Sequence, residues 1–407
     1  MKRIGIVTTW FERGAAYVSK QFKEVWEKEN EVFIYARGGE DLAVNAPKWM
    51  CKNITYGKRY SYTNLDIINL KHFEEWIKKN DLDIVFFNEQ HIWDPVLLCS
   101  KLGVITGSYI DYYTEETVPL FDIFDFLICN TKRHYSVFKL HPENYFIPWG
   151  TNQNIFNAKQ KKDTDKEKIT FFHSAGMNPY RKGTDFLIQA FLNLNSNNSK
   201  LIIHTQVDIF KFFPSLNKIC KNLIKSKKLE IINETVSAPG LYCKGDVYVY
   251  PTRLEGIGLS IAEANSCGLP VITTNQAPMN EFILHGINGS LISVAESRKR
   301  NDNYFWEESY IDVDHLTFLM NDYILNIDLL EEKKQQAIKY SRNNFNWNKN
   351  SISLLEIVKQ VKKRNISNET FEKVTRYEKS RGIKFYLANM LIYSKFKKGL
   401  KYFLTKK

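Results

Sequence analysis

Short apolar runs alternate with amphipathic segments along most of the chain. In the first part, runs rich in Val, Ile and Phe predict strands, and the segments between them carry apolar residues at helical spacing. The predicted strands are 3–9, 32–36, 84–88, 104–110, 126–130 and 145–147, and the predicted helices are 16–28, 67–80 and 95–102. Near-continuous apolar strands between amphipathic helices are typical of a parallel sheet with helices on both faces.

A polar, charge-mixed stretch at 157–168, NAKQKKDTDKEK, interrupts this alternation and predicts a linker. The alternation then resumes with strands at 169–173, 201–204, 229–233, 247–250, 271–274 and 291–294, and helices at 184–194, 214–226, 260–267, 315–325 and 329–344. A chain of 407 residues exceeds the size of one core. We therefore predict an α/β protein with two doubly wound, Rossmann-like domains that face a cleft. The predicted parts are a first domain (1–157), a linker (158–168), a second domain (169–360) and C-terminal helices with a basic tail (361–407).

The segment 246–283 is the most specific motif of the chain. It predicts a strand, a glycine-bearing turn at 255–259, a short helix that ends at Gly268, and a second strand. Glycines before a helix leave backbone N–H groups free at its N-terminus, where an anion can bind. Two carboxylates, Glu255 and Glu263, flank this place with seven residues between them.

This segment resembles the donor-site signature of retaining glycosyltransferases of family four (group 1), which have the GT-B architecture. The matching residues are Pro251-Thr252-Arg253, Glu255-Gly256-Ile257-Gly258-Leu259, Glu263-Ala264 and Gly268-Leu269-Pro270-Val271-Ile272. The resemblance implies that the second domain binds a nucleotide sugar, the first domain binds the acceptor, and the last helix crosses back to the first domain. It also implies that no metal is required, and we favour a UDP-sugar as the donor.

The resemblance assigns a role to each matched residue. Glu255 is the catalytic residue that orients the transferred sugar, and Glu263 accepts hydrogen bonds from the ribose hydroxyls. A second interpretation of Glu263 is a capping box with Ser260. The phosphate-binding group that the resemblance implies comprises Arg181, Lys182, Gly14, Gly256, Ile257, Gly258 and Leu259. Met177 stands where the family usually has an Arg that contributes to this group.

The first domain departs from the family at one position. Many members carry a His after the fourth or fifth strand, and this chain has Gly107-Ser108-Tyr109-Ile110-Asp111 there. In the family this His contacts the transferred sugar. We assign that contact to Asp111 here, with Tyr109 and His91 as alternatives. Because the His is absent, the sequence does not identify the donor sugar. Choice of base and sugar is expected to depend on loop residues such as Val207 and 234–236. The DxD at 81–83 begins a strand and is interpreted as turn chemistry rather than a metal site.

The charge of +12 admits anionic partners. No nucleic-acid-binding signature is present, and residues 379–407 carry nine Lys or Arg and no acid. This basic amphipathic segment predicts either peripheral contact with an anionic membrane or a helix that packs back on the protein, and both interpretations stay open. Six scattered cysteines indicate reduced cytosolic thiols rather than a disulfide framework or a zinc site. The chain contains no apolar run of about 18 residues, so no membrane-spanning helix is predicted.

Together these features predict a cytoplasmic enzyme, soluble or on the inner face of the membrane. It would move a sugar from a nucleotide donor to a hydroxyl of a glycan, a lipid-linked saccharide or a protein, and we expect a role in cell-surface polysaccharide synthesis. Two alternatives are a degenerate GT-B domain that binds nucleotide sugar without transfer, and a GT-B epimerase or phosphorylase.

Overall fold

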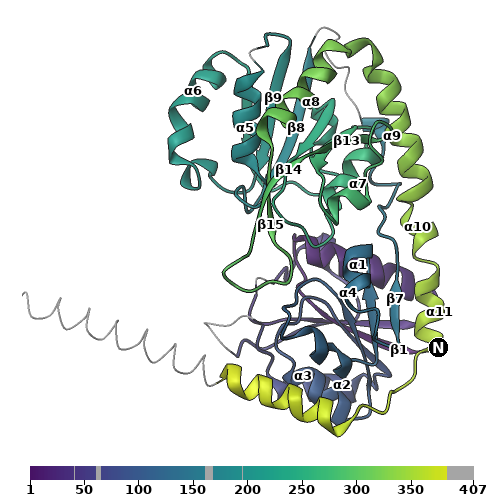
Figure 1. Cartoon of the computed structure of the whole chain (residues 1–407). Helices are drawn as coiled ribbons and strands as arrows, with labels where there is room; N and C mark the ends of the chain where they lie inside the picture. Colours follow the sequence, from purple (N-terminus) through teal and green to yellow (C-terminus); the bar gives the residue numbers. More distant parts are fainter. Residues whose placement is uncertain (41, 61–65, 161–167, 195, 383–407) are drawn as a thin grey trace, which may run out of the picture.

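The computed structural model describes residues 1–40, 42–60, 66–160, 168–194 and 196–382. Two α/β units lie one above the other, with a long green-to-yellow run of helices along one side (Figure 1). The first unit, here called the first domain, contains a seven-stranded parallel sheet in the order β3-β2-β1-β4-β5-β6-β7. Its strands are β1 (Arg3–Thr8), β2 (Glu31–Ala36), β3 (Ile54–Tyr56), β4 (Ile84–Phe87), β5 (Ile105–Tyr109), β6 (Phe126–Cys129) and β7 (Asn144–Phe146).

The second unit, the second domain, contains a six-stranded parallel sheet in the order β10-β9-β8-β11-β12-β13. Its strands are β8 (Ile169–Gly176), β9 (Ser199–Thr205), β10 (Leu229–Asn233), β11 (Val247–Tyr250), β12 (Val271–Thr274) and β13 (Gly289–Ile292). The central strands are almost wholly buried, as near-continuous apolar runs predict. The two sheets confirm the predicted pair of doubly wound parallel-sheet domains.

The strand order locates the site before any side chain is considered. In each sheet the first strand is central, and successive strands are added first on one side of it and then on the other. This switch in strand order falls between β1 and β4 in the first domain and between β8 and β11 in the second. Ligands of such sheets bind outside the carboxyl ends of the strands at this switch point. The loops that follow β1, β4, β8 and β11 therefore hold the candidate residues.

Helices cover both faces of each sheet. Those of the first domain are α1 (Gly14–Trp26), α2 (Leu70–Lys79), α3 (Asp94–Lys101) and α4 (Lys132–Val137). Those of the second domain are α5 (Thr184–Asn193), α6 (Asn217–Lys225), α7 (Leu259–Ser266), α8 (Val313–Leu325) and α9 (Leu330–Asn344). One apolar core runs through both domains, and each sheet has a further core on its other face.

After α9 the chain returns to the first domain through α10 (Trp347–Asn350) and α11 (Ser353–Gln360). The indole of Trp26 in α1 donates a 3.2 Å hydrogen bond to the carbonyl of Leu354 in α11. A last helix at 368–382 lies beside α2 and α3 (Figure 1) and buries Val374 in the core of the first domain. The predicted membrane segment lies mostly outside the described residues, which include only 379–382 of it.

Two features depart from the predicted elements. The stretch between the predicted strand 291–294 and the predicted helix 315–325, for which no element is predicted, forms an antiparallel hairpin of β14 (Val294–Arg298) and β15 (Glu308–Ile311) that extends toward the first domain (Figure 1). The short elements β3 and α4 were also not predicted. Within the described part of the chain, no helix is both long and apolar enough to cross a membrane. The six cysteines, all described, are free.

Candidate functional site

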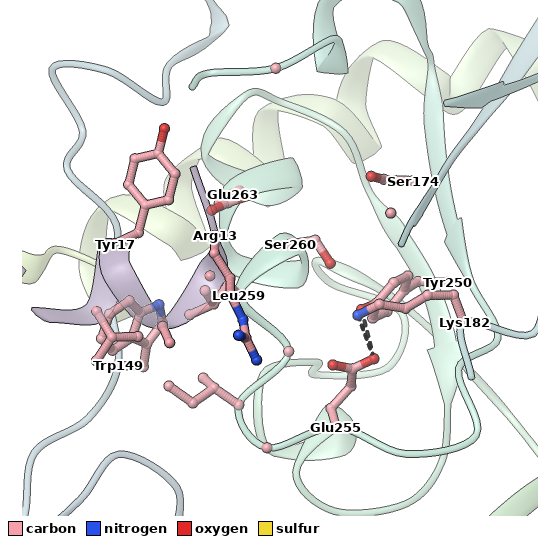
Figure 2. A pocket seen from close by; sticks show the side chains of 18 of the residues that line it. Arg13, Tyr17, Trp149, Ser174, Lys182, Tyr250, Glu255, Leu259, Ser260 and Glu263 are labelled. Atoms are coloured by element: carbon pink, nitrogen blue, oxygen red, sulfur yellow. Dashed lines mark hydrogen bonds and ion pairs between the residues drawn. The ribbon is translucent and has the colours of Figure 1, made fainter. Parts of the chain in front are cut away.

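A cavity of about 620 Å³ lies between the carboxyl ends of the two sheets, and both domains line it. Every residue assigned a catalytic, phosphate-binding or ribose-binding role from the sequence lines this cavity: Gly14, Asp111, Arg181, Lys182, Glu255, Gly256, Ile257, Gly258, Leu259 and Glu263. Figure 2 labels Lys182, Glu255, Leu259 and Glu263 among them. The alternatives Tyr109 and His91 line it as well. The roles that the resemblance assigns to them stay predictions.

Glu255 is the most tightly bound side chain in the cavity. Its Oε2 accepts from Arg181 at 2.9 Å, and its Oε1 accepts from the Lys182 ammonium at 2.7 Å. The hydroxyls of Tyr250 and Thr252 also donate to Oε1, each at 2.7 Å. The carboxylate that the resemblance assigns to the sugar is therefore also the ion-pair partner of both cations assigned to the diphosphate.

Burial and charge set the protonation of this cluster. Burial alone would favour a neutral Glu255, but Arg181 and Lys182 outweigh it and lower the pKa of the carboxyl to about 2. Burial, together with the like charge of Arg181, lowers the pKa of Lys182 to about 8. Near pH 7 the cluster thus carries one anion and two cations, with a net positive charge that suits an anionic ligand.

Local backbone geometry explains the position of the two cations. They precede Gly183, which caps α5 with φ +68°, and a Cβ there would lie 1.9 Å from the carbonyl oxygen of Pro251. Arg253 clamps the same turn, because its guanidinium makes bidentate hydrogen bonds of 2.8 and 2.6 Å to Asp185 in the first turn of α5. The Pro-Thr-Arg triplet therefore holds the basic turn against the end of β11.

Glu263 does not form the capping box that the second interpretation proposed. Helix α7 begins at Leu259, Gly258 is its N-cap at φ +88°, and no side chain caps it. Instead, Oε2 of Glu263 accepts a 2.6 Å hydrogen bond from the hydroxyl of Tyr242. Burial raises the pKa of Glu263. The carboxylate points into the cavity near Arg13 and Tyr17 of the first domain (Figure 2).

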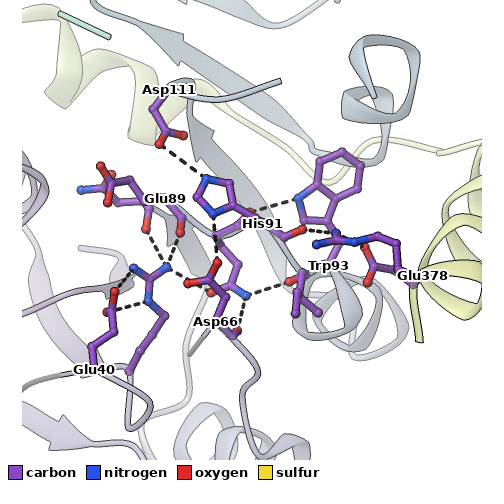
Figure 3. Close-up of polar contacts among 12 residues, drawn as sticks. Glu40, Asp66, Glu89, His91, Trp93, Asp111 and Glu378 are labelled. Carbon is purple, nitrogen blue, oxygen red and sulfur yellow. Dashed lines mark hydrogen bonds and ion pairs between the residues drawn. The ribbon is translucent and has the colours of Figure 1, made fainter. Parts of the chain in front are cut away.

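The first domain contributes a charged network around His91 (Figure 3). The ring of His91 lies between two carboxylates, 3.0 Å from Asp66 and 3.6 Å from Asp111. Burial opposes protonation of the ring, but these two carboxylates raise the pKa of His91 to about 10. His91 and Asp111 therefore form an ion pair that lines the cavity.

Glu89 is a cavity residue that the sequence interpretation missed. It follows β4 at the switch point, with φ +50°, and its carboxylate lies 3.5 Å from Arg13. Burial, together with the charge of Asp111, raises its pKa to about 7. Its place directly after β4 was the signal that could have found it, because strand ends at the switch point supply ligand contacts.

The sequence interpretation also missed two residues of α4, Arg133 and His134, which support the glycine turn from the first domain. Arg133 donates a 2.6 Å hydrogen bond to the carbonyl of Glu255, and His134 Nε2 lies 2.9 Å from the carbonyl oxygen of Gly256. Burial lowers the pKa of His134 to about 3, so the ring is neutral. A neutral ring that donates from Nε2 to Gly256 can accept at Nδ1 from the Tyr113 hydroxyl, at 2.8 Å. The first domain thereby fixes the glycine turn of the second.

Some residues singled out from the sequence lie elsewhere. Val236 lines the cavity, whereas Val207, Glu234 and Thr235 do not. Met177 is exposed and does not line it. In the Asp81-Leu82-Asp83 stretch, Asp83 accepts a 2.7 Å hydrogen bond from the backbone N–H of Arg3. In the part of the chain that the structure describes, no group of three or more His, Cys, Asp or Glu could hold a metal ion.

Comparison with known sequences points to one family. Residues 168–300 match the family model described as "Glycosyl transferases group 1". A probable sucrose-phosphate synthase from Thermosipho melanesiensis is 28% identical over 41% of this chain and 42% of its own length. An uncharacterized glycosyltransferase from Methanocaldococcus jannaschii is 29% identical over 44% of this chain and 43% of its own length. The chain thus spans about two fifths of the length of these curated relatives.

Solved structures share the fold over nearly the whole chain. HepE from Anabaena, in complex with UDP and glucose, has a TM-score of 0.70 at 14% identity and covers 89% of this chain and 100% of its own. WaaG, a glycosyltransferase involved in lipopolysaccharide biosynthesis, has a TM-score of 0.61 at 15% identity and covers 87% and 99%. At such identities the likeness shows the fold alone.

Two doubly wound domains with a shared cleft define the GT-B class of proteins. Within this fold, the second domain matches the family model of the group 1 glycosyltransferases over residues 168–300.

Proposed function

We propose that this protein is a retaining glycosyltransferase that moves a sugar from a UDP-sugar to a hydroxyl group of a saccharide acceptor. One observation carries the proposal: two cations and two carboxylates, Arg181, Lys182, Glu255 and Glu263, line one cavity with first-domain residues opposite them. HepE, the Anabaena structure in complex with UDP and glucose, supports the choice of UDP.

In the proposed reaction, the bond between the anomeric carbon and the β-phosphate oxygen breaks, and the acceptor oxygen bonds to the same face of that carbon. The acceptor proton passes to the departing phosphate oxygen. Arg181 and Lys182 stabilise the negative charge that develops on the diphosphate, so no metal ion is needed for that role. Glu255 holds the cations in place and orients the sugar, and Asp111 faces the sugar from the first domain.

The donor assignment predicts selective binding of one nucleotide. UDP should stabilise the protein in thermal-shift and calorimetric titrations more than GDP, ADP or CDP does. Glu263→Ala should weaken UDP binding by about tenfold or more, because a buried carboxylate that accepts from ribose hydroxyls is lost. Glu230→Ala is the matched control, since Glu230 lies in β10 and does not line the cavity.

The same titration separates the alternatives. If none of the four nucleotides stabilises the protein, the donor assignment is contradicted and a phosphorylase is favoured. Binding of UDP with no release of UDP from UDP-glucose, UDP-galactose or UDP-N-acetylglucosamine would favour a degenerate binding domain.

We further propose that the acceptor belongs to cell-surface polysaccharide synthesis, which the lipopolysaccharide role of WaaG supports. The basic segment 379–407 would hold the protein on an anionic membrane at about 1 kcal/mol per cation near the surface. We expect the full chain to co-sediment with vesicles that contain phosphatidylserine and not with phosphatidylcholine vesicles. A variant that lacks 383–407 should lose this binding, and retained binding would contradict the membrane role.

A further inference from the structure

A second cavity, of about 850 Å³, adjoins the first. Its walls come from the loops after β4 and β5, the tip of the β14–β15 hairpin at 299–307, and the last helix at 368–382. Six residues line both cavities: His91, Tyr109, Asp111, Tyr112, Arg300 and Tyr304. A molecule in the second cavity could therefore present an atom to the first.

The hairpin tip makes this cavity by crossing from the second domain to the first. Tyr304 forms an antiparallel bridge with Thr114, and the backbone N–H of Phe305 donates a 3.0 Å hydrogen bond to the carbonyl of Tyr113. The indole of Trp306 donates to the Tyr113 hydroxyl at 2.6 Å. These contacts make 299–307, here called the hairpin arm, a fixed wall of the cavity.

The lining offers aromatic surface beside Asp111. Tyr112 is only partly buried, its ring stacks on Tyr304 with centroids 5.0 Å apart, and its hydroxyl donates to the carbonyl of Asp302. Trp93 and Tyr377 line the same cavity. Partly exposed rings with polar neighbours suit a sugar, which has apolar C–H faces and hydroxyls at its edges.

The charges of the lining disfavour a strongly anionic ligand. Arg300 is paired with Asp302 at 2.6 Å and Arg381 with Glu378 at 3.1 Å. Three exposed acids line the same cavity, Glu115, Glu116 and Glu307. Among the described residues, none of these three acids forms an ion pair. Lys299 also lines the cavity, and no ion pair of this lysine is seen among the described residues. A phosphate group would therefore meet three acids and two paired arginines for this one lysine.

We propose that this second cavity is the acceptor site, that the hairpin arm and Tyr112 form its specificity-determining wall, and that it takes an uncharged saccharide rather than a sugar phosphate. This inference rests on the proposed function. The acceptor ring would lie against Tyr112, and its reacting hydroxyl would reach the first cavity at Asp111.

The test compares uncharged and phosphorylated acceptors. UDP-glucose, UDP-galactose and UDP-N-acetylglucosamine are each offered with p-nitrophenyl glycosides of common hexoses or with hexose 6-phosphates. We expect transfer to the glycosides. Tyr112→Ala should raise the acceptor KM by about tenfold, as loss of a binding aromatic ring does, with the Kd for UDP unchanged. Tyr112→Phe should keep the KM near that of the unaltered protein, and Tyr60→Ala, at an exposed tyrosine outside both cavities, is the control.

Each outcome decides the inference separately from the donor assignment. An unchanged acceptor KM in Tyr112→Ala, or preferred transfer to hexose 6-phosphates, overturns it. If no acceptor in the panel reacts, saturation-transfer NMR measures direct binding of the glycosides. Binding that Tyr112→Ala abolishes supports the site, and absence of binding to the unaltered protein overturns it. If the unaltered protein did not bind UDP, the proposed function would be overturned instead.

Discussion

Glu255→Gln is expected to lower kcat for release of UDP from the sugar donor by about 100-fold or more, and to destabilise the fold. The carboxylate accepts from four donors, two of them the cations Arg181 and Lys182. A glutamine amide has one acceptor oxygen, so either orientation turns an N–H toward a cation or a hydroxyl donor. The two cations then also lose the anion that balances them. We expect a loss of transition-state stabilisation of about 3 kcal/mol.

The accompanying loss of stability has its own measurement. Breaking a buried ion pair from one side typically costs about 3 kcal/mol or more, because the remaining charges are left without a partner. Urea unfolding followed by circular dichroism should show this loss. In the matched control, Glu230→Gln, the pair with Lys200 is more than one third exposed on both sides. That variant should lose at most about 1 kcal/mol.

These results would be contradicted in two distinguishable ways. A variant with kcat within threefold of the unaltered protein would show that Glu255 does not act on the reacting sugar. A variant as stable as Glu230→Gln, with low kcat, would show that the carboxylate contributes to the reaction and not to the balance of charge.

The second-domain half of the site was readable from the sequence because short-range chemistry determines it. Gly183, Gly258 and Gly268 all adopt positive φ, where glycine is favoured. Gly183 and Gly258 are the N-caps of α5 and α7, and Gly268 follows the C-terminus of α7. The predicted helix 260–267 and the observed α7 at Leu259–Ser266 differ by one residue at each end. Residues next to such turns are placed by the turn itself.

The first-domain half depends on contacts between residues distant in sequence, and such contacts leave little local signal. Arg133 and His134 belong to a polar segment that suggests a surface, yet both are buried against the glycine turn 122 positions away. No residue of β14 is buried, and the strand contains polar residues, so no alternation of apolar and polar positions marks it. Its pairing with β15 stabilises it instead, and the hairpin arm contacts Tyr113 of the first domain through Phe305.

Lys182→Met is expected to lower turnover at least tenfold, and by about 30- to 1000-fold if Lys182 contributes the 2–4 kcal/mol typical of a charge-stabilising group. Methionine keeps the volume of the side chain and removes its charge. Lys200→Met, at a partly exposed lysine in β9 that pairs with Glu230, is the matched control and should retain full turnover.

The pH dependence of UDP binding tests the same residue without a reaction. Burial and Arg181 lower the pKa of Lys182 to about 8, so its proton is present below pH 7 and is lost as the pH rises through 8. Only the cationic form attracts the diphosphate, so calorimetry should show a constant Kd for UDP near pH 7 and a Kd that rises above pH 8, by up to about tenfold per pH unit. In Lys182→Met the Kd should be weaker and level across this range. If the variant kept the rise above pH 8, a different group would be titrating, and the diphosphate contact could not be assigned to Lys182.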